Sequence, residues 1–192
     1  GNLPVAIAAG RGGVWVANEG DDTVDRIDPV TGDVTKRGIQ VGGRPDGIAV
    51  GPSAVWVAVP YWSRLVRIDP ATNRVVGHAA LDYEPCGYLA DDSTGAVWSA
   101  ACGGDVVGRV DPRTNELTAR VAEVDPVGLK VAFGSVWVAA SGSGNVDRID
   151  PRTGRLVGRL HVGGLIVRLG ASFGSIWVND DFGRVLRIKP QR

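Results

Sequence analysis

A tryptophan that returns at an almost constant spacing is the feature that most constrains this chain. Trp15, Trp56, Trp98, Trp137 and Trp177 lie 39 to 42 residues apart. An Asp-Pro dipeptide follows each of the first four tryptophans 13 residues later, and Lys-Pro follows the fifth. A fixed period near 40 residues, with several short apolar segments in each period, indicates a chain built from copies of one structural unit.

Each copy has the pattern of four short strands, which we call a, b, c and d in chain order. In the first copy they are VAIAAG (5–10), GVWVAN (13–18), TVDRID (23–28) and VTKRGIQV (34–41). Apolar residues alternate, β-branched residues are frequent, and no segment has a helical apolar period over three turns. The sequence therefore predicts an all-β fold, a β-propeller of about five blades with four antiparallel strands each.

The connection from strand c to strand d has its own turn signal. In Asp28-Pro29-Val30-Thr31-Gly32, proline sets φ for a type I turn, aspartate can cap the turn, and glycine takes the left-handed position. Asn73 and Asn115 replace that glycine in two copies, and asparagine tolerates the same conformation. We expect a tight c–d reversal in every copy.

The predicted domain covers 1–192, with blades at about 4–41, 45–82, 85–125, 126–163 and 165–192. The fifth copy has no strand d. Three arrangements remain open: a closed five-bladed ring with one three-stranded blade, an arc of a larger propeller, and a chain that has lost an N-terminal strand. Five complete inner strands favour the closed ring, in which Trp15 and Trp177 would both be buried.

Charge and hydropathy exclude two classes of partner. Lys plus Arg and Asp plus Glu both number 21, so no net field favours nucleic acid. No apolar run approaches the roughly 18 residues needed to span a bilayer, so no membrane insertion by this chain is expected. The remaining partners are a small molecule, a glycan or a protein loop at the propeller mouth, and fusion to other domains in a longer protein is one expectation.

Two copies, VWVANEGDDTVDRIDPVTG (14–32) and VWVAASGSGNVDRIDPRTG (136–154), resemble the bacterial YVTN-type β-propeller repeat, a relative of the NHL repeat. Similar repeats occur in streptogramin B lyases and in extracytoplasmic sensor propellers of actinobacterial Ser/Thr kinases. The resemblance covers essentially the whole chain. It implies the propeller fold and leaves the activity open, because one propeller frame hosts many functions.

The lyase resemblance implies histidines and a glutamate around Mg²⁺ in the central channel. This chain has two histidines, His78 and His161, and both fall on strand d, the outermost strand. The a-strand starts that face the channel are Val5, Asp46, Cys86, Val127 and Val167, without His or Glu. We therefore expect no enzyme, no catalytic residue, no metal and no cofactor, with a metal-dependent lyase or hydrolase as the alternative.

The d–a and b–c loops emerge on one face, where propellers usually bind ligands. The b–c loops are built from small and acidic residues, except the second, which contains Pro60, Tyr61 and Trp62. Tyr61 and Trp62 are interpreted either as a stacking surface for a sugar, peptide or partner loop, or as a lid over the channel mouth. The polar candidates for ligand binding on this face are Asp46, Arg44, Asp180 and Arg168.

Two other recurring patterns favour structural roles. The pairs Asp21-Asp22 and Asp180-Asp181 could hold a cation, but turn chemistry explains them better because no spaced metal-binding motif accompanies them. The c-strand arginines recur in all five copies, which indicates bonds to carbonyls or carboxylates of their own blade rather than a ligand role. They are Arg26, Arg67, Arg109, Arg148 and Arg187.

The only cysteines, Cys86 and Cys102, fall on strands a and b of the third copy. In a hairpin centred near Thr94 they lie opposite each other, at a separation that suits a disulfide. A redox centre or metal site is less favoured, because Cys-x-x-Cys spacing and clustered histidines are missing from the sequence. A disulfide indicates an oxidising compartment and an extracytoplasmic location, secreted, periplasmic or at the cell surface.

Together these observations predict a non-catalytic extracytoplasmic binding or sensor propeller that recognises its ligand on the d–a and b–c face. The alternatives are the metal-dependent lyase or hydrolase and a structural scaffold with no small-molecule site.

Overall fold

Nineteen strands form the regular structure of the computed structural model, which describes residues 1–92, 94–123 and 125–190. They make five antiparallel sheets in which consecutive strands pair, four strands in each of the first four sheets and three in the fifth. Two short 3₁₀ helices lie in b–c loops. The predicted β-propeller of five blades, the last without its outer strand, is confirmed.

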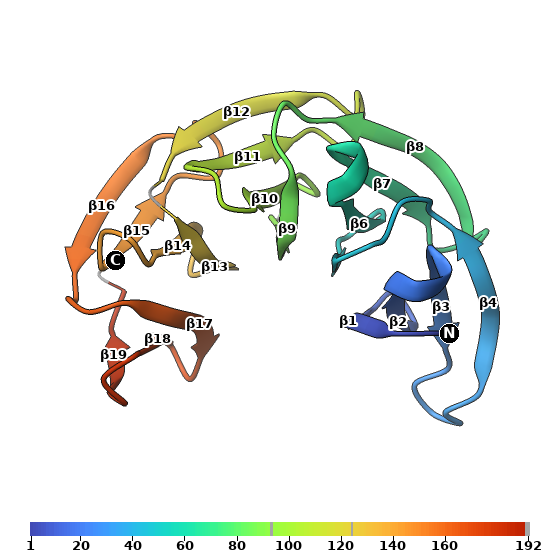
Figure 1. Cartoon of the computed structure of the whole chain (residues 1–192), viewed down its shortest axis with the longest axis horizontal. Coiled ribbons are helices and arrows are strands. Elements are labelled where there is room, and N and C mark those ends of the chain that lie inside the picture. The colour runs from blue at the N-terminus through green and yellow to red at the C-terminus, as the bar shows by residue number, and fades with distance from the viewer. Residues whose placement is uncertain (93, 124, 191–192) are drawn as a thin grey trace.

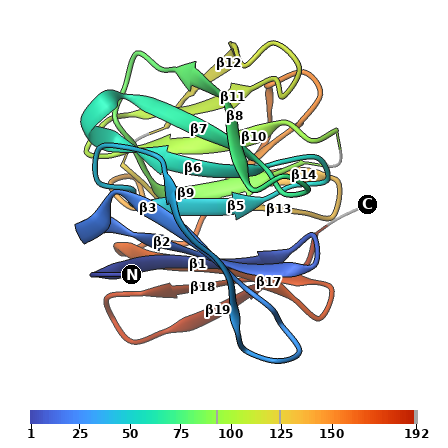
Figure 2. The same cartoon turned by 90° about the vertical axis from the view of Figure 1, so that its right-hand side faces the viewer.

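Each blade uses its strands in the expected order, from the innermost outward (Figure 1). The first sheet contains β1 (Pro4–Gly10), β2 (Gly13–Asn18), β3 (Thr23–Ile27) and β4 (Val34–Gln40). The second contains β5 (Gly47–Val50), β6 (Val55–Val59), β7 (Arg64–Asp69) and β8 (Arg74–Ala80). The third contains β9 (Pro85–Asp91), β10 (Val97–Ala101), β11 (Val106–Val110) and β12 (Leu117–Ala122). The fourth contains β13 (Pro126–Ala132), β14 (Ser135–Ala140), β15 (Asn145–Ile149) and β16 (Leu156–His161). The fifth contains β17 (Ile166–Ser172), β18 (Ser175–Asp180) and β19 (Val185–Ile188). The helices are η1 (Glu19–Asp21) and η2 (Pro60–Trp62), and both lie on the same face of the molecule (Figure 2).

The c–d turns have the predicted geometry. Asp28 Oδ1 accepts the N–H groups of Val30 and Thr31 at 2.7 and 3.1 Å. These bonds lower the pKa of Asp28. The residue that closes the turn has a positive φ, 77° at Gly32 and 55° at Asn73, so glycine and asparagine are used where the backbone requires them.

The core is a series of apolar layers between successive sheets, and the recurring tryptophan is central to each layer. Trp15 packs between the first and second sheets, Trp56 between the second and third, Trp98 between the third and fourth, and Trp137 between the fourth and fifth. The first three are fully buried. A b-strand tryptophan is therefore covered by the inner strands of the next blade.

The five sheets form an open arc, and the closed ring favoured by the sequence is wrong. Figure 1 shows the first and fifth sheets apart at the two ends of the arc. Trp177 is partly exposed, because no next blade covers it among the described residues. Ile7 and Phe173, near the two ends, are 69% and 91% exposed. The apolar layer between two neighbouring blades sets the angle between them. The four angles between the five blades do not add up to a closed ring.

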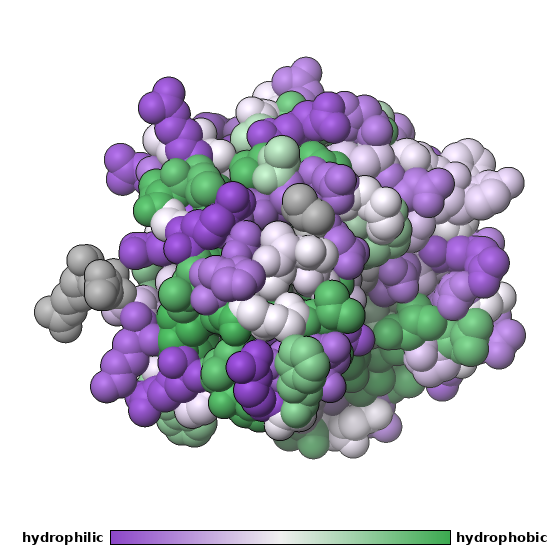
Figure 3. All heavy atoms as spheres, turned by 60° about the vertical axis from the view of Figure 1, so that its left-hand side comes forward, coloured by the Kyte–Doolittle hydropathy of each residue, from purple (hydrophilic) through white to green (hydrophobic). Residues whose placement is uncertain are grey.

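Other apolar side chains reach the surface on the side of the fourth and fifth blades (Figure 3). On β16 they include Leu156, Val157 and Leu160, and in the fifth blade Phe182 and Val185. The described residues contain no helix that is long and apolar enough to cross a membrane.

Candidate functional site

The loops that enter strand a and the loops that leave strand b meet on one face, and main-chain hydrogen bonds join them. The first residue after each strand d donates its N–H to the b–c loop of the same blade. These bonds are Val41 to Asp22 at 3.0 Å, Leu81 to Ser63 at 2.8 Å, Glu123 to Asp105 at 3.0 Å and Val162 to Gly144 at 2.9 Å. The face is therefore a set of coupled loops on a rigid strand scaffold.

Acidic residues of the b–c loops tie these loops together. Asp22 Oδ1 accepts the N–H of Arg44 at 2.7 Å, and Asp181 Oδ1 accepts the N–H of Leu165, the equivalent residue of the fifth blade, at 3.0 Å. Asp105 Oδ1 likewise accepts the N–H of Asp125 at 3.1 Å. Turn chemistry thus accounts for the acidic pairs, and no group of three or more His, Cys, Asp or Glu suited to a metal occurs in the described part of the chain.

The aromatic pair of the second blade lies at this face on η2. Tyr61 is 79% exposed and Trp62 is 54% exposed, and their rings meet edge to face with centroids 6.1 Å apart. The indole of Trp62 lies directly over Gly43, where an added Cβ would come within 1.8 Å of the ring. The guanidinium of Arg64 stacks on the Trp62 ring, with its Cζ 4.9 Å from the ring centroid. The same guanidinium donates a hydrogen bond to Val41 O at 3.2 Å. Trp62 is therefore held in place by its loop, whereas Tyr61 projects from it.

The fifth blade repeats this arrangement, which the sequence reading missed. The ring of Phe182 lies over Gly164, and the Cζ of Arg184 lies 5.6 Å from the ring centroid. Arg184 also donates to Gly163 O at 3.5 Å. The signal was present in the sequence as a Val-Gly-Gly loop before strand a and an aromatic-x-Arg triplet after strand b, in Trp62-Ser63-Arg64 and Phe182-Gly183-Arg184.

The six predicted ligand-binding residues separate into two groups. Tyr61, Trp62 and Arg44 gather around the first d–a loop, where Arg44 forms an ion pair with Glu19. Asp46 lies further along the same segment, exposed, with its carboxylate beside Gly87 of the third blade.

Asp180 and Arg168 belong to the fifth blade. Asp180 is buried, accepts the N–H groups of Phe182 and Arg184 at 3.1 and 2.9 Å, and pairs with the Arg184 side chain. Hydrogen bonds and the positive charge of Arg184 lower the pKa of Asp180, although burial acts in the opposite direction and is the largest single influence. This carboxylate organises its own loop and does not join the group around Trp62.

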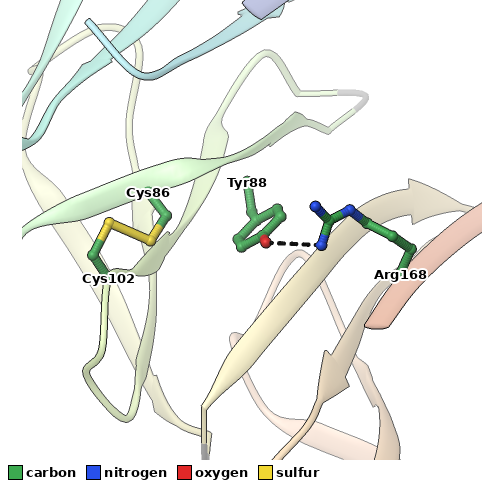
Figure 4. The surroundings of a disulfide bond; sticks show 4 residues. All are labelled: Cys86, Tyr88, Cys102 and Arg168. Carbon is green, nitrogen blue, oxygen red and sulfur yellow. Dashed lines mark hydrogen bonds between the residues drawn. A yellow bond between two sulfur atoms is a disulfide. The ribbon is translucent and has the colours of Figure 1, made fainter. Parts of the chain in front are cut away.

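Arg168 reaches across the inner wall of the arc. It is exposed on β17, yet its guanidinium donates to the hydroxyl of Tyr88 on β9 at 3.3 Å and lies 5.8 Å from the ring centroid (Figure 4). Strand β13 of the fourth blade packs against both of these strands. The pair therefore links the third and fifth blades over the concave side.

The disulfide is the covalent feature of the same wall. Cys86 and Cys102 are bonded with a Cα–Cα distance of 4.9 Å, beside Tyr88 (Figure 4). The predicted pairing is confirmed. A register shift between Ser99 and Ala101 accompanies it, so the bridge sits at an irregular end of the β9–β10 ladder.

Removing the disulfide with the double substitution Cys86→Ser and Cys102→Ser is expected to lower the free energy of unfolding by about 2 to 3 kcal/mol, because the bridge closes a loop of moderate length in the unfolded chain. Urea unfolding followed by tryptophan fluorescence measures the change. A reducing agent should lower wild-type stability by the same amount, and an unchanged midpoint in both experiments would contradict the prediction.

The two histidines lie where the strand pattern predicted. His78 is exposed on β8, and His161 is exposed on β16 with its Nδ1 3.0 Å from Asn145 Oδ1. Both are on outermost strands, away from the inner strands β1, β5, β9, β13 and β17.

Comparison with solved structures agrees with this arrangement of blades. Hydrazine synthase of Kuenenia stuttgartiensis superposes with a TM-score of 0.77 at 17% identity, over 97% of this chain and 66% of the other. The fold is that of a β-propeller. Virginiamycin B lyase of Staphylococcus aureus, solved with quinupristin, gives 0.76 at 15% identity over 98% of this chain and 70% of the other. BamB of Moraxella catarrhalis gives 0.75 at 17% identity over 97% and 58%.

These likenesses establish the fold alone. No family model matches the sequence, and no curated protein matches it. The chain spans 66% of the hydrazine synthase chain and 58% of the BamB chain, so it corresponds to part of the length of these neighbours.

Proposed function

We propose that this propeller arc is a non-catalytic binding module that recognises a small molecule, glycan or protein loop on the face formed by the d–a and b–c loops. Tyr61 and Trp62 are the anchors of this surface, and Arg44 and Asp46 supply polar specificity beside them.

The observation that carries the proposal is the exposure of two large aromatic rings on a loop that already fixes one of them. Trp62 rests on Gly43 and under Arg64, so a ligand that stacks on it would not have to order the ring. Tyr61 projects next to it with most of its surface in solvent. Aromatic side chains give large contact areas at low conformational cost, and they dominate many binding surfaces.

The disulfide supports an extracytoplasmic location for this module. Disulfides persist in oxidising compartments and are rare in the reducing cytosol. Cys86 lies on β9, which begins at the proposed binding face, and Cys102 directly follows β10, which ends there. In a module that meets its ligand outside the cytoplasm, the disulfide would hold the ends of these two strands together covalently at the binding face.

Replacing Tyr61 or Trp62 with alanine is expected to weaken binding at least 10-fold, because each ring supplies contact area at the centre of the surface. The probes are a glycan array and an immobilised random peptide library, and affinities are then measured for the members that wild-type protein retains. The free energy of unfolding should change by less than about 1 kcal/mol, since both rings are largely exposed.

The matched control is Phe173→Ala, which removes an exposed aromatic ring from an a–b turn on the opposite face. It should leave binding unchanged. Equal losses in all three variants, or a loss of folding in the Tyr61 and Trp62 variants that matches the loss of binding, would overturn the proposal.

The absence of catalysis is tested with the substrate class that the lyase neighbour suggests. Wild-type protein incubated with quinupristin and Mg²⁺ should leave the antibiotic with unchanged chromatographic retention. Conversion that depends on the protein would show that the module is an enzyme.

A further inference from the structure

In four of the five blades, the c-strand arginine forms side-chain hydrogen bonds with other groups of the protein. Arg26 donates to the carbonyls of Arg11 and Gly12, and Arg109 donates to Thr94 and Thr118 and lies 3.5 Å from Asp92. Arg148 and Arg187 donate to Ser135 and Ser175 at 2.7 and 2.8 Å. These contacts agree with a structural role for the repeated arginine.

Arg67 is the exception. Its Nε, like that of Arg109, is buried without a hydrogen-bond partner, but unlike Arg109 its side chain forms no other hydrogen bond and no ion pair with any residue that the structure describes. Leaving a buried N–H of a charged group unpaired costs about 1 to 3 kcal/mol. The repeat pattern therefore does not by itself explain why Arg67 is held in this position.

The first blade shows which contact Arg67 lacks. Arg26 crosses to the c–d turn of the second blade, where its Nη1 donates to Pro70 O at 2.9 Å and to Asn73 Oδ1 at 3.0 Å. The corresponding turn for Arg67 is that of the third blade, in which Asn115 occupies the position of Asn73. Asn115 Oδ1 is also buried without a partner. The acceptor of the repeated contact, Asn115 Oδ1, and the Nε of Arg67 are thus both without a hydrogen-bond partner at this blade junction.

A cleft of about 600 Å³ opens at this junction. It is lined by Arg67 and Ser53 of the second blade, Thr94, Arg109 and the Asp111–Arg113 segment of the third, and Arg152 of the fourth. Its walls therefore carry four arginines against one aspartate. Arg152, like Arg67, has no carboxylate within ion-pair distance in the described part of the chain, whereas Arg113 lies 3.8 Å from Asp111.

We propose that this cleft binds the phosphoryl group of a phosphate ester or free phosphate, with Arg67 as its principal ligand and Arg152 and Arg113 completing the positive wall. Guanidinium groups bind phosphate oxygens through paired, charge-assisted N–H bonds. The hydroxyl of Ser53 supplies a further polar group at the same cleft. The site lies at the a–b and c–d turns, on the face opposite Tyr61 and Trp62, so it is independent of the function proposed above.

The test is isothermal titration of the native protein with inorganic phosphate at constant ionic strength, in a buffer without other oxyanions. Saturable binding is expected, and Arg67→Gln should weaken it at least 10-fold. The matched control, Arg74→Gln, removes one exposed arginine of the same sheet that does not line the cleft. It should leave phosphate binding unchanged.

O-phosphoserine and glucose 6-phosphate form the second arm. Tighter binding of one of them than of inorganic phosphate would identify the covalent carrier of the phosphoryl group, and equal binding would indicate free phosphate. Either result supports the site. No saturable binding, or equal weakening by Arg67→Gln and Arg74→Gln, would overturn it.

Thermal unfolding separates this role from a purely structural one. Arg26→Gln is expected to lower Tm because it removes four hydrogen bonds, whereas Arg67→Gln removes an unpaired buried N–H and should not lower Tm of the phosphate-free protein. An equal loss of Tm in the two variants would show that Arg67 is a structural arginine and would contradict the proposal.

Discussion

Replacing Trp98 with alanine is expected to lower the free energy of unfolding by about 4 kcal/mol, the largest effect of any single substitution proposed for this chain. Trp98 is fully buried between the third and fourth sheets, in contact with the layer that contains Leu129 and Val138. Its Nε1 also donates to the buried carboxylate of Asp92 at 3.2 Å. The substitution therefore removes apolar packing, leaves a cavity and weakens the environment of a buried charge.

The measurement is equilibrium unfolding in urea, with Trp62→Ala as the matched control because it makes the same chemical change at an exposed position. The control should lose less than about 1 kcal/mol. If the alanine variant does not fold, Trp98→Phe gives the readout instead, since it keeps most of the packing and should lose about 1 to 2 kcal/mol with the hydrogen bond. Equal stability of Trp98→Phe and wild type would contradict this account of the layer.

The second large effect is a loss of stability as the pH rises, and it originates at Glu123. The first residue after strand d is Val41, Leu81 or Val162 in three blades, but Glu123 in the third, where it is 2% exposed. It faces the buried Asp147 of the fourth blade and lies 3.8 Å from Arg159 Nη2, while Arg159 Nε donates to Asp147 Oδ1 at 2.8 Å. One arginine thus serves two buried carboxyl groups at this blade junction.

Burial, with the help of the Asp147 carboxylate and against the influence of Arg159, raises the pKa of Glu123 to about 8 from 4.5. Below pH 4.5 the group is protonated in both the folded and the unfolded chain, and its contribution to stability is fully present. Between pH 4.5 and 8 unfolding releases a proton, so stability falls as the pH rises. Above pH 8 the loss is complete.

Glu123→Gln is expected to abolish this fall, because glutamine has nearly the same shape and stays neutral. Urea unfolding at pH 5.0 and pH 8.5 measures the difference, and at pH 8.5 the variant should be more stable than wild type. Glu116→Gln, at an exposed position of the same blade, should keep the wild-type pH dependence. An unchanged fall in Glu123→Gln would assign the effect to another group.

The candidate surface shows how far sequence reasoning could go at the level of single residues. Tyr61 and Trp62 were recognisable because large aromatics interrupt a run of small and acidic loops. The structure adds that Trp62 packs on Gly43 and Arg64, and that Phe182 repeats this arrangement. Both arrangements depend on a contact between a d–a loop and a b–c loop. These loops are about 20 residues apart in sequence, and no local pattern shows that they touch.

Asp180 and Arg67 show that the sequence does not reveal which polar side chains have partners within the protein. In the sequence, Asp180 resembled a free loop carboxylate. In the structure it is buried and accepts hydrogen bonds that hold its own turn together. Arg67 resembled four other arginines, yet within the described residues it forms no hydrogen bond to the turn of the next blade, the contact that Arg26 makes in the first blade. Whether a polar side chain is satisfied depends on the neighbouring blade, and sequence repeats hide such differences.

The sequence by itself determined the strands, the turns between them, the number of blades, the missing outer strand and the pairing of Cys86 with Cys102. All of these depend on local periodicity, on turn residues with particular φ values, or on register within one hairpin. Only the tertiary structure decided that the blades form an open arc, that Glu123 meets Asp147, and that Arg67 faces a cleft. These features arise from the packing angle and contacts between blades, which are set by side chains far apart in the chain.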